Sequence, residues 1–285
     1  MSKKDSNFIC GKNNVITYIK WICIISYIIL LCLKKLSLTN IPIDILSILN
    51  FVPLILFGWI HGIQRYGVKN MVIWFVITFI VSNFFEGFSI AYGFPFGNYH
   101  YSIVGFRIWN VPISIMPTYF GIAYTSWTVA QAAISKFNSK FNGLYKFIVP
   151  ISSAIVMTMY DLVQDPIAST LQGQWIWEDG GAYFGVPISN FFGWVFVVYI
   201  FMQIYTLFIS NQEISVKNKV IDSHKGFWIE PIIMYFAMGM GFVLEALICK
   251  ENTTIITSMG MISVFTMIFV SVIAFINVKN SKELD

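Results

Sequence analysis

The chain has 285 residues, of which 57% are hydrophobic, 18% aromatic and only 11% charged, and its formal net charge is +4. Because soluble domains carry about 25% charged residues, this composition excludes an ordinary soluble protein and indicates an integral membrane protein. The lysines lie in short loops and form no basic patch, which argues against a nucleic-acid partner.

A transmembrane helix needs about 20 mostly apolar residues, and eight segments meet this requirement. We therefore predict an all-α fold, a polytopic bundle of about eight transmembrane helices that forms one membrane domain over residues 1–285. No small-residue cleavage site follows the first apolar run, so we expect a retained helix rather than a signal peptide. In chain order the predicted helices are Val15–Leu33, Ile43–Gly62, Met71–Tyr92, Val111–Ile134, Leu144–Val163, Pro187–Ile209, Ile229–Cys249 and Ile255–Val278.

The basic residues predict the orientation of this bundle. With eight helices the two termini share one side of the membrane, and that side carries 13 Lys and Arg residues against 4 on the other. Cytoplasmic loops carry the excess of positive charge, so both termini are predicted to be cytoplasmic. Two charged residues lie at the inner ends of helices. Lys20 is expected to snorkel to the interface, and Glu230 is expected to cap the start of its helix.

Acidic side chains gather in the opposite, outer half of the predicted bundle. Glu86, Asp161, Asp165 and Glu245 each lie near the outer end of a helix, and Asn190 lies at the outer start of another. Ionisable residues at membrane depth are costly and usually mark a function. We therefore expect a shared site, with Asp161, Asp165 and Glu86 as catalytic groups and Glu245 as a further candidate.

Asp161 and Asp165 are four residues apart and so share one helix face. Two close carboxylates resist double ionisation, so the pair is expected to hold a proton near neutral pH and to act as a general acid. A simpler interpretation is that Asp165 shapes a turn before Pro166 and that Asp161 bonds a neighbouring helix. The other acids on the same side favour the catalytic interpretation.

Two outer loops, 93–110 and 166–186, are rich in glycine, proline and aromatic residues. Such aromatic residues often form the ordinary belt at a membrane interface, but their faces also stabilise a developing cation. Because both loops lie on the side of the four acids, we expect them to share one site. Carboxyl groups beside aromatic walls suit proton chemistry on an apolar substrate.

Several other chemistries lack the residues that they need. The chain has no Gly-x-Gly-x-x-Gly motif for a dinucleotide. His61 and His224 fall on one side of the membrane and His100 on the other, so we expect no histidine-clustered metal site. The four cysteines form no Cys-x-x-Cys pair, which makes metal-site and disulfide roles weak and favours simple packing.

A set of short motifs between about residues 83 and 194 carries a family resemblance. The motifs are Glu86-Gly87, Gly93-Phe-Pro-Phe-Gly-Asn-Tyr99, Val111-Pro112, Tyr160-Asp-Leu-Val-Gln-Asp-Pro166, Trp175-Ile-Trp177, Gly181-Ala-Tyr-Phe-Gly-Val-Pro187 and Asn190-Phe-Phe-Gly-Trp194. Together they resemble the membrane carotenoid biosynthesis proteins of the carotenoid 1,2-hydratase type. That group includes the bisanhydrobacterioruberin hydratases of archaea and the γ-carotene 1′,2′-hydratases of bacteria. The motifs are more specific for the family than for the reaction.

The resemblance implies the addition of water across the terminal C1=C2 double bond of an acyclic ψ end group, a hydro-lyase reaction without a cofactor. Asp161 or Asp165 would protonate C2 and leave a tertiary cation at C1, which water held by Glu86 and Asn190 would attack. The implied partners are a polyene carotenoid, water and the lipid of a prokaryotic cell membrane. The motifs supply the other substrate-binding candidates, which are Tyr99, Tyr160, Trp175, Trp177, Tyr183 and Trp194.

Three other functions fit parts of the pattern. A carotenoid cyclase would also use an acid and a carbocation. A membrane prenyltransferase would use Asp161-x-x-x-Asp165 to bind a magnesium diphosphate, although a second Asp-rich motif is missing and this side is poor in Lys and Arg. A proton-coupled transporter would use buried acids as a relay, although the inverted repeats that favour a transporter are not evident.

Overall fold

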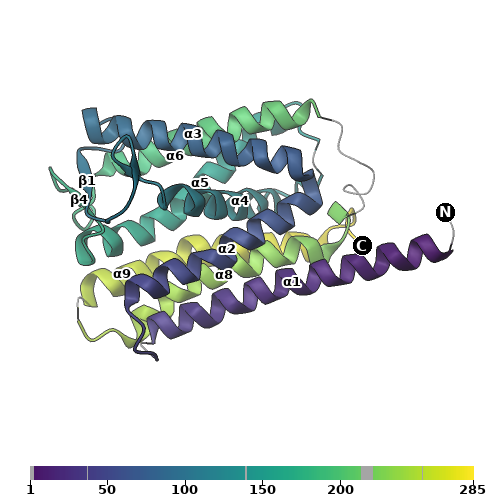
Figure 1. Cartoon of the computed structure of the whole chain (residues 1–285), viewed down its shortest axis with the longest axis horizontal. Helices are drawn as coiled ribbons and strands as arrows, with labels where there is room; N and C mark the ends of the chain where they lie inside the picture. Colours follow the sequence, from purple (N-terminus) through teal and green to yellow (C-terminus); the bar gives the residue numbers. More distant parts are fainter. Residues whose placement is uncertain (1–2, 37, 139, 213–220, 252) are drawn as a thin grey trace.

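The structure is a computed structural model that describes residues 3–36, 38–138, 140–212, 221–251 and 253–285. Long helices run roughly along a common axis (Figure 1). Seven helices among the described residues are long and apolar enough to cross a membrane, so the predicted helical membrane bundle is confirmed. The α-helices of the described residues, including those outside that set of seven, are α1 (Lys3–Lys35), α2 (Ile43–Tyr66), α3 (Val68–Tyr92), α4 (Ile115–Ala133), α5 (Tyr145–Asp165), α6 (Ile188–Ser210), α8 (Lys225–Ile248), α9 (Thr253–Ser263) and α10 (Phe269–Asn280).

Each predicted transmembrane segment coincides with a helix of the structure. The last one is formed by α9, the π-helical turn η2 (Val264–Ile268) and α10, which follow one another without a break. The start of α1 and the end of the chain lie at one end of the bundle. Two short strands, β1 (Tyr99–Tyr101) and β4 (Trp175–Trp177), lie at the other end (Figure 1).

The fourth helix differs from its prediction in its start and in its surroundings. The predicted start, Val111, belongs to strand β3 (Val111–Pro112), which pairs antiparallel with β2 (Arg107–Ile108), and α4 begins only at Ile115. The turn between these strands has positive φ angles of 49° at Trp109 and 67° at Asn110, a conformation that a right-handed helix cannot include. Most of α4 is buried, and it is not one of the seven strongly apolar helices.

Helix α5 continues past its predicted end at Val163. It runs to Asp165 and passes directly into the π-helical turn η1 (Pro166–Leu171). Proline lacks the backbone N–H that would bond the carbonyl four residues earlier, here that of Leu162. The hydroxyl group of Tyr183 donates to this carbonyl oxygen instead, at 3.0 Å. Asp165 therefore stays within a continuous helix and does not shape a turn before Pro166.

The loop between α3 and β1 is fixed to two helices. Ser89 of α3 accepts hydrogen bonds from the backbone N–H groups of Phe96, at 3.1 Å, and Gly97, at 3.3 Å. Ser189, near the start of α6, donates to the backbone carbonyl of Phe96 at 2.8 Å. Bonds from both helices thus determine where β1 begins.

Two buried ion pairs stabilise the half of the bundle away from β1 and β4. Lys20 of α1 is 2% exposed and pairs with Glu230 of α8, which is 3% exposed. Arg65 Nε lies 3.1 Å from Asp222 Oδ1. The predicted roles of Lys20 and Glu230 are wrong, because the lysine stays inside the bundle and the carboxylate binds it rather than capping α8. A buried charge without a partner is strongly destabilising, which explains why the two meet.

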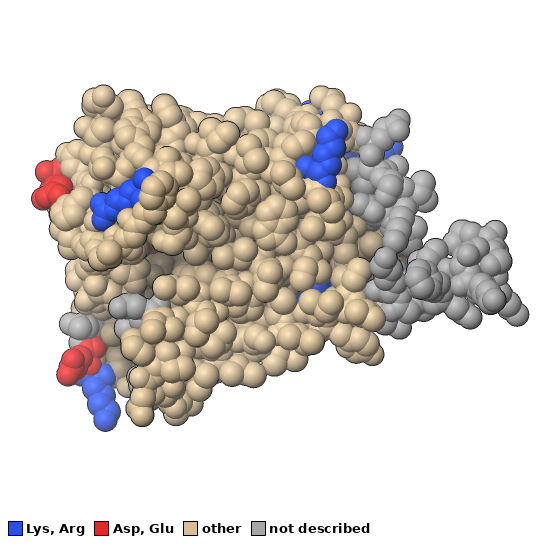
Figure 2. Space-filling model, viewed as in Figure 1, with Lys and Arg blue, Asp and Glu red and all other residues tan. Residues whose placement is uncertain are grey.

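The outer surface is apolar along the length of the bundle. Figure 2 shows that the charged side chains of this face lie mostly toward its two ends, with uncharged residues between them. On α1, for example, Ile22, Ile25 and Ile29 are 61%, 52% and 53% exposed. Exposed apolar side chains on long helices fit contact with lipid rather than water.

Candidate active site

A cavity of about 910 Å³ lies toward the end of the bundle that carries β1 and β4. Its outer part is lined by Val104 and Phe106, which are 96% and 72% exposed, so the cavity reaches the surface. Figure 2 shows a recess in the left part of the visible face. The cavity lining includes nine of the residues predicted for the site: Glu86, Tyr99, Tyr160, Asp161, Asp165, Trp175, Trp177, Asn190 and Trp194.

Two predicted candidates lie apart from this lining. Tyr183 supports α5 through its bond to the Leu162 carbonyl, and burial together with the nearby Asp161 raises the pKa of this phenol to about 12. Glu245 forms an ion pair with Lys35. Lys35 itself lines the cavity, so Glu245 neutralises a lysine of the wall and does not join the other carboxyl groups.

Strands β1 and β4 place four aromatic side chains on one face of a small sheet. They pair antiparallel, with Tyr99 opposite Trp177 and Tyr101 opposite Trp175. Because alternate residues of a strand point to opposite faces, these four rings share the face toward the cavity. The ring centroids are 4.9 Å apart in the first pair and 6.1 Å in the second. His100, on the opposite face, is exposed and pairs with Glu178.

Glu86 of α3 is enclosed by three tyrosine hydroxyl groups. Tyr101 donates to Oε2 at 3.0 Å, Tyr99 donates to the same oxygen, and Tyr119 of α4 donates to Oε1. The carboxyl group is only 4% exposed. Burial, followed by the charge of Glu86, raises the pKa of Tyr99 and Tyr101 well above the ordinary phenol value. Both phenols therefore stay protonated and remain hydrogen-bond donors.

Asp161 and Asp165 meet at one amide group. Asn190 Nδ2, at the start of α6, donates to Asp161 Oδ2 at 2.8 Å and to Asp165 Oδ2 at 2.7 Å. The other oxygen of Asp165 accepts bonds from the indole N–H groups of Trp175, at 2.9 Å, and Trp177, at 3.3 Å. Both carboxyl groups are almost fully buried. Thus one sheet donates to Glu86 from β1 and to Asp165 from β4.

Sequence reasoning missed Tyr101 and Tyr119. Tyr101 lies two residues after Tyr99 in a strand. Alternate residues of a strand point to the same face, so this spacing was a signal that could have identified Tyr101. Tyr119 had no local signal, because it comes from the buried helix α4. Its ring stacks on that of Trp194 with a centroid distance of 4.9 Å and an interplanar angle of 15°.

The wall away from the carboxyl groups is largely apolar, and its polar members are Lys34 and Lys35 of α1 and Ser47 and Asn50 of α2. It is formed by residues of α1, α2 and α8, among them Leu31, Phe51, Ile55 and Phe242. The cavity therefore joins a polar end, with three carboxyl groups and several aromatic rings, to a largely apolar part. Among the described residues, no three His, Cys, Asp or Glu side chains are grouped as a metal site would require.

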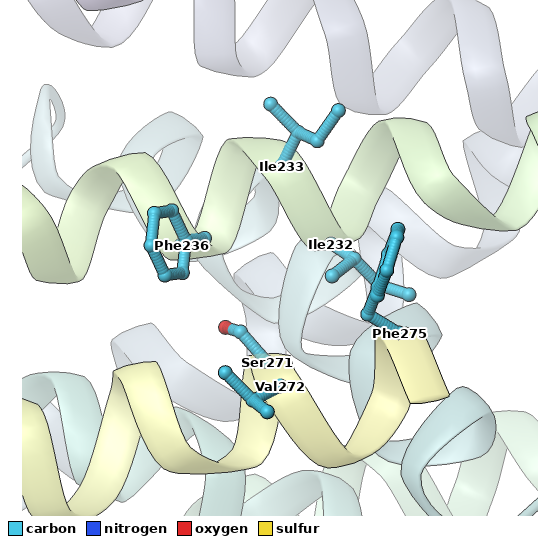
Figure 3. Close-up of a pocket in the computed structure, with 6 residues that line it drawn as sticks. All are labelled: Ile232, Ile233, Phe236, Ser271, Val272 and Phe275. Atoms are coloured by element: carbon cyan, nitrogen blue, oxygen red, sulfur yellow. The ribbon is translucent and has the colours of Figure 1, made fainter. Parts of the chain in front are cut away.

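A second, smaller pocket has no such chemistry. Its volume is about 240 Å³, and it lies between α8 and α10 (Figure 3). Ser271 carries the single hydroxyl group of its lining and donates to the Met267 carbonyl at 2.7 Å. The lining residues are Ile232, Ile233, Phe236, Ser271, Val272 and Phe275. The larger cavity is therefore the candidate active site.

Comparison with protein families identifies a match. The family model described as carotenoid biosynthesis protein matches residues 44–265. No curated protein and no solved structure matches the chain. The matched range contains Glu86, Asp161 and Asp165, as well as both strands of the sheet that binds them.

Proposed function

The chain belongs to the carotenoid biosynthesis protein family and is an integral membrane protein, and from this premise we propose that it hydrates the terminal C1=C2 double bond of an acyclic carotenoid. One observation carries the proposal: Glu86, Asp161 and Asp165 line a single cavity whose wall on the side of α1, α2 and α8 is largely apolar. Hydration of a polyene end needs both features, since carboxyl groups must reach a carbon atom that is attached to a long apolar chain.

The reaction begins with transfer of a proton from the Asp161–Asp165 pair to C2. The electron pair of the double bond forms the new C–H bond and leaves a tertiary cation at C1. Aromatic faces such as those of Trp194 and Tyr119 stabilise this cation. Water then attacks C1 and loses a proton to a carboxylate, which gives a tertiary alcohol. General acid–base catalysis of this kind contributes about 10²–10⁴ in rate.

The substrate proposed is a polyene that reaches the site from the lipid, and the second substrate is water. The orientation proposed places both termini in the cytoplasm of a prokaryotic cell and the cavity in the outer half of its plasma membrane, as the distribution of basic residues favours. The partners are thus a carotenoid, water and membrane lipid, and the activity is that of a cofactor-independent hydro-lyase.

Expression in a lycopene-producing bacterial host tests this function. Pigments are separated by liquid chromatography and identified by mass spectrometry. We expect a product heavier by one water per modified end, absent with Asp161→Asn. A cyclised product would have an unchanged mass and a prenylated one a larger increase, so the mass separates hydration from these reactions. Unchanged pigments from both lycopene and a C50 precursor, with the protein folded in the membrane, would refute the proposal.

A further inference from the structure

The three carboxyl groups of the cavity receive unequal numbers of hydrogen bonds, and from this we infer their separate roles. We propose that Asp161 is the proton donor to C2, that Glu86 accepts the proton of the attacking water, and that Asp165 remains an anion that positions the donor. This assignment rests on the proposed hydration. It goes further because the reaction alone does not say which carboxyl group is acid and which is base.

Asp165 has the environment of a permanent carboxylate. Its side chain accepts three N–H bonds, from Asn190, Trp175 and Trp177. Indole and amide nitrogens of this kind donate and do not accept, so each of these bonds favours the charged form of the acceptor. N–H groups donate to both oxygens of Asp165. If Asp165 were protonated, its own O–H group would therefore point toward another donor.

Asp161 has the environment of a neutral acid. Among the described residues, a single hydrogen bond reaches its carboxyl group, from Asn190. Its Oδ2 atom and that of Asp165 both lie within 2.8 Å of the same nitrogen, and two carboxylates so close resist double ionisation. The tyrosines that interact electrostatically with it, Tyr119, Tyr160 and Tyr183, carry no charge to offset a second anion. The shared proton therefore resides on Asp161, which lines the cavity.

Glu86 has the environment of an anionic base. Three phenol hydroxyls donate to it, and those of Tyr99 and Tyr101 stay protonated because the pKa of each is raised by burial and by Glu86 itself. A carboxylate offers about four lone-pair sites, so three donors leave room for a water molecule. Three donors weaken Glu86 as a base, but a tertiary cation is so strong an electrophile that the attacking water needs only a weak one.

The proton balance closes over one turnover. Asp161 gives its proton to C2, the oxygen of water bonds to C1, and Glu86 takes the proton released from that water. Substrate and water become one alcohol, and the enzyme is left with a charged Asp161 and a neutral Glu86. The proton then returns from Glu86 to Asp161 through water that enters at the exposed mouth of the cavity, beside Val104.

Hydration in deuterium oxide separates the two roles, because protonation labels C2 before water attacks. The wild-type protein should give an alcohol with one deuterium at C2. In Glu86→Gln the rate of alcohol formation should fall by about 100-fold or more. The recovered polyene should still carry deuterium, because a cation that water does not attack returns to an alkene by losing a proton. Asp161→Asn should give neither alcohol nor deuterium, and Asp161→Glu should recover some of both.

Glu178→Gln is the matched control. It removes an exposed carboxylate just after β4 that pairs with His100, on the face of the sheet away from the cavity, and it should change neither readout. Tyr119→Phe tests the base without removing a charge and should slow alcohol formation more than labelling. The assignment would be overturned if Asp161→Asn protein still introduced deuterium. It would also be overturned if Glu86→Gln or Tyr119→Phe protein that folds normally introduced none. No alcohol and no labelling from the wild type would refute the hydration itself, which keeps the two failures distinct.

Discussion

Tyr101 and Trp175 are opposite one another across β1 and β4, yet they donate hydrogen bonds to different carboxyl groups. Tyr101 donates to Glu86 at 3.0 Å, and Trp175 donates to Asp165 at 2.9 Å. A sheet with three paired residues on each strand thus sets the position of Glu86 relative to the Asp161–Asp165 pair. This arrangement makes the register of β1 and β4 as important to the site as the helices themselves.

The indole of Trp175 is the first test of this arrangement. Trp175→Phe keeps a ring but removes the N–H donor to Asp165. Hydrogen bonds to charged groups contribute about 1.5–3 kcal/mol, which corresponds to a rate about 10- to 100-fold lower. Trp177→Phe removes a longer bond of 3.3 Å and should have a smaller effect. Initial rates of alcohol formation, normalised to protein in the membrane, make the comparison, and equal rates for Trp175→Phe and the wild type would contradict it.

The amide of Asn190 is expected to matter more, because it bonds two carboxyl groups at once. Asn190→Leu keeps most of the volume and removes both bonds, so we expect the rate to fall by about 100-fold or more. Asn277→Leu is the matched control. It removes a bond of 2.7 Å to the Ala133 carbonyl between α10 and α4, and should lower stability without changing the rate of the folded protein. A similar loss of rate in both variants would argue against a specific role for Asn190.

The buried pair of Lys20 and Glu230 predicts an effect on stability. Lys20→Met leaves Glu230 charged and enclosed, which should cost about 3–5 kcal/mol. Replacing both residues with apolar ones of similar size should restore most of this loss, since such a substitution is often neutral or stabilising. Thermal unfolding in detergent compares the purified wild type, the Lys20→Met variant and the double variant. A double variant, Lys20→Met with Glu230→Leu, that is no more stable than Lys20→Met alone would show that the pairing contributes little.

The bond from Tyr183 to the Leu162 carbonyl predicts both a stability loss and a pH dependence. Tyr183→Phe leaves that carbonyl without its donor, at a cost of about 1–3 kcal/mol, whereas Tyr18→Phe, at an exposed position, should cost nothing. The pKa of Tyr183 is raised to about 12 from about 10 in an unfolded chain. The pKa of Tyr183 is higher in the folded protein than in the unfolded chain. Its contribution to the free energy of unfolding is therefore complete below about pH 10 and is lost as the pH rises toward about 12.

Unfolding curves for wild type and Tyr183→Phe at neutral and alkaline pH provide this measurement. The difference between the two proteins should be constant up to about pH 10 and shrink above it. A difference that instead disappears near neutral pH would contradict the proposed role of the phenol as a donor to α5.

The sequence predicted the helices well because each is a long apolar segment, and length and apolarity are local properties. It also indicated Glu86, Asp161, Asp165 and Asn190, since polar residues stand out against an apolar background. It did not predict how they pair. The register of β1 with β4 joins two three-residue strands that are far apart in the chain, and Lys20 meets Glu230 across 210 residues. Contacts of that kind depend on tertiary packing, which no local pattern encodes.

The burial of α4 has a consequence for how the protein is made. Most of its hydroxyl and amide side chains form hydrogen bonds within the protein. Thr125, for example, donates to the Gly121 carbonyl at 2.9 Å, and Arg65 donates to Gln131 at 2.9 Å. Outside the bundle, Gln131 would face hydrocarbon without Arg65 of α2. We therefore expect α4 to leave the insertion machinery together with neighbouring helices rather than alone. The candidate active-site cavity, including Tyr119, would then form only when α2, α4 and α5 assemble.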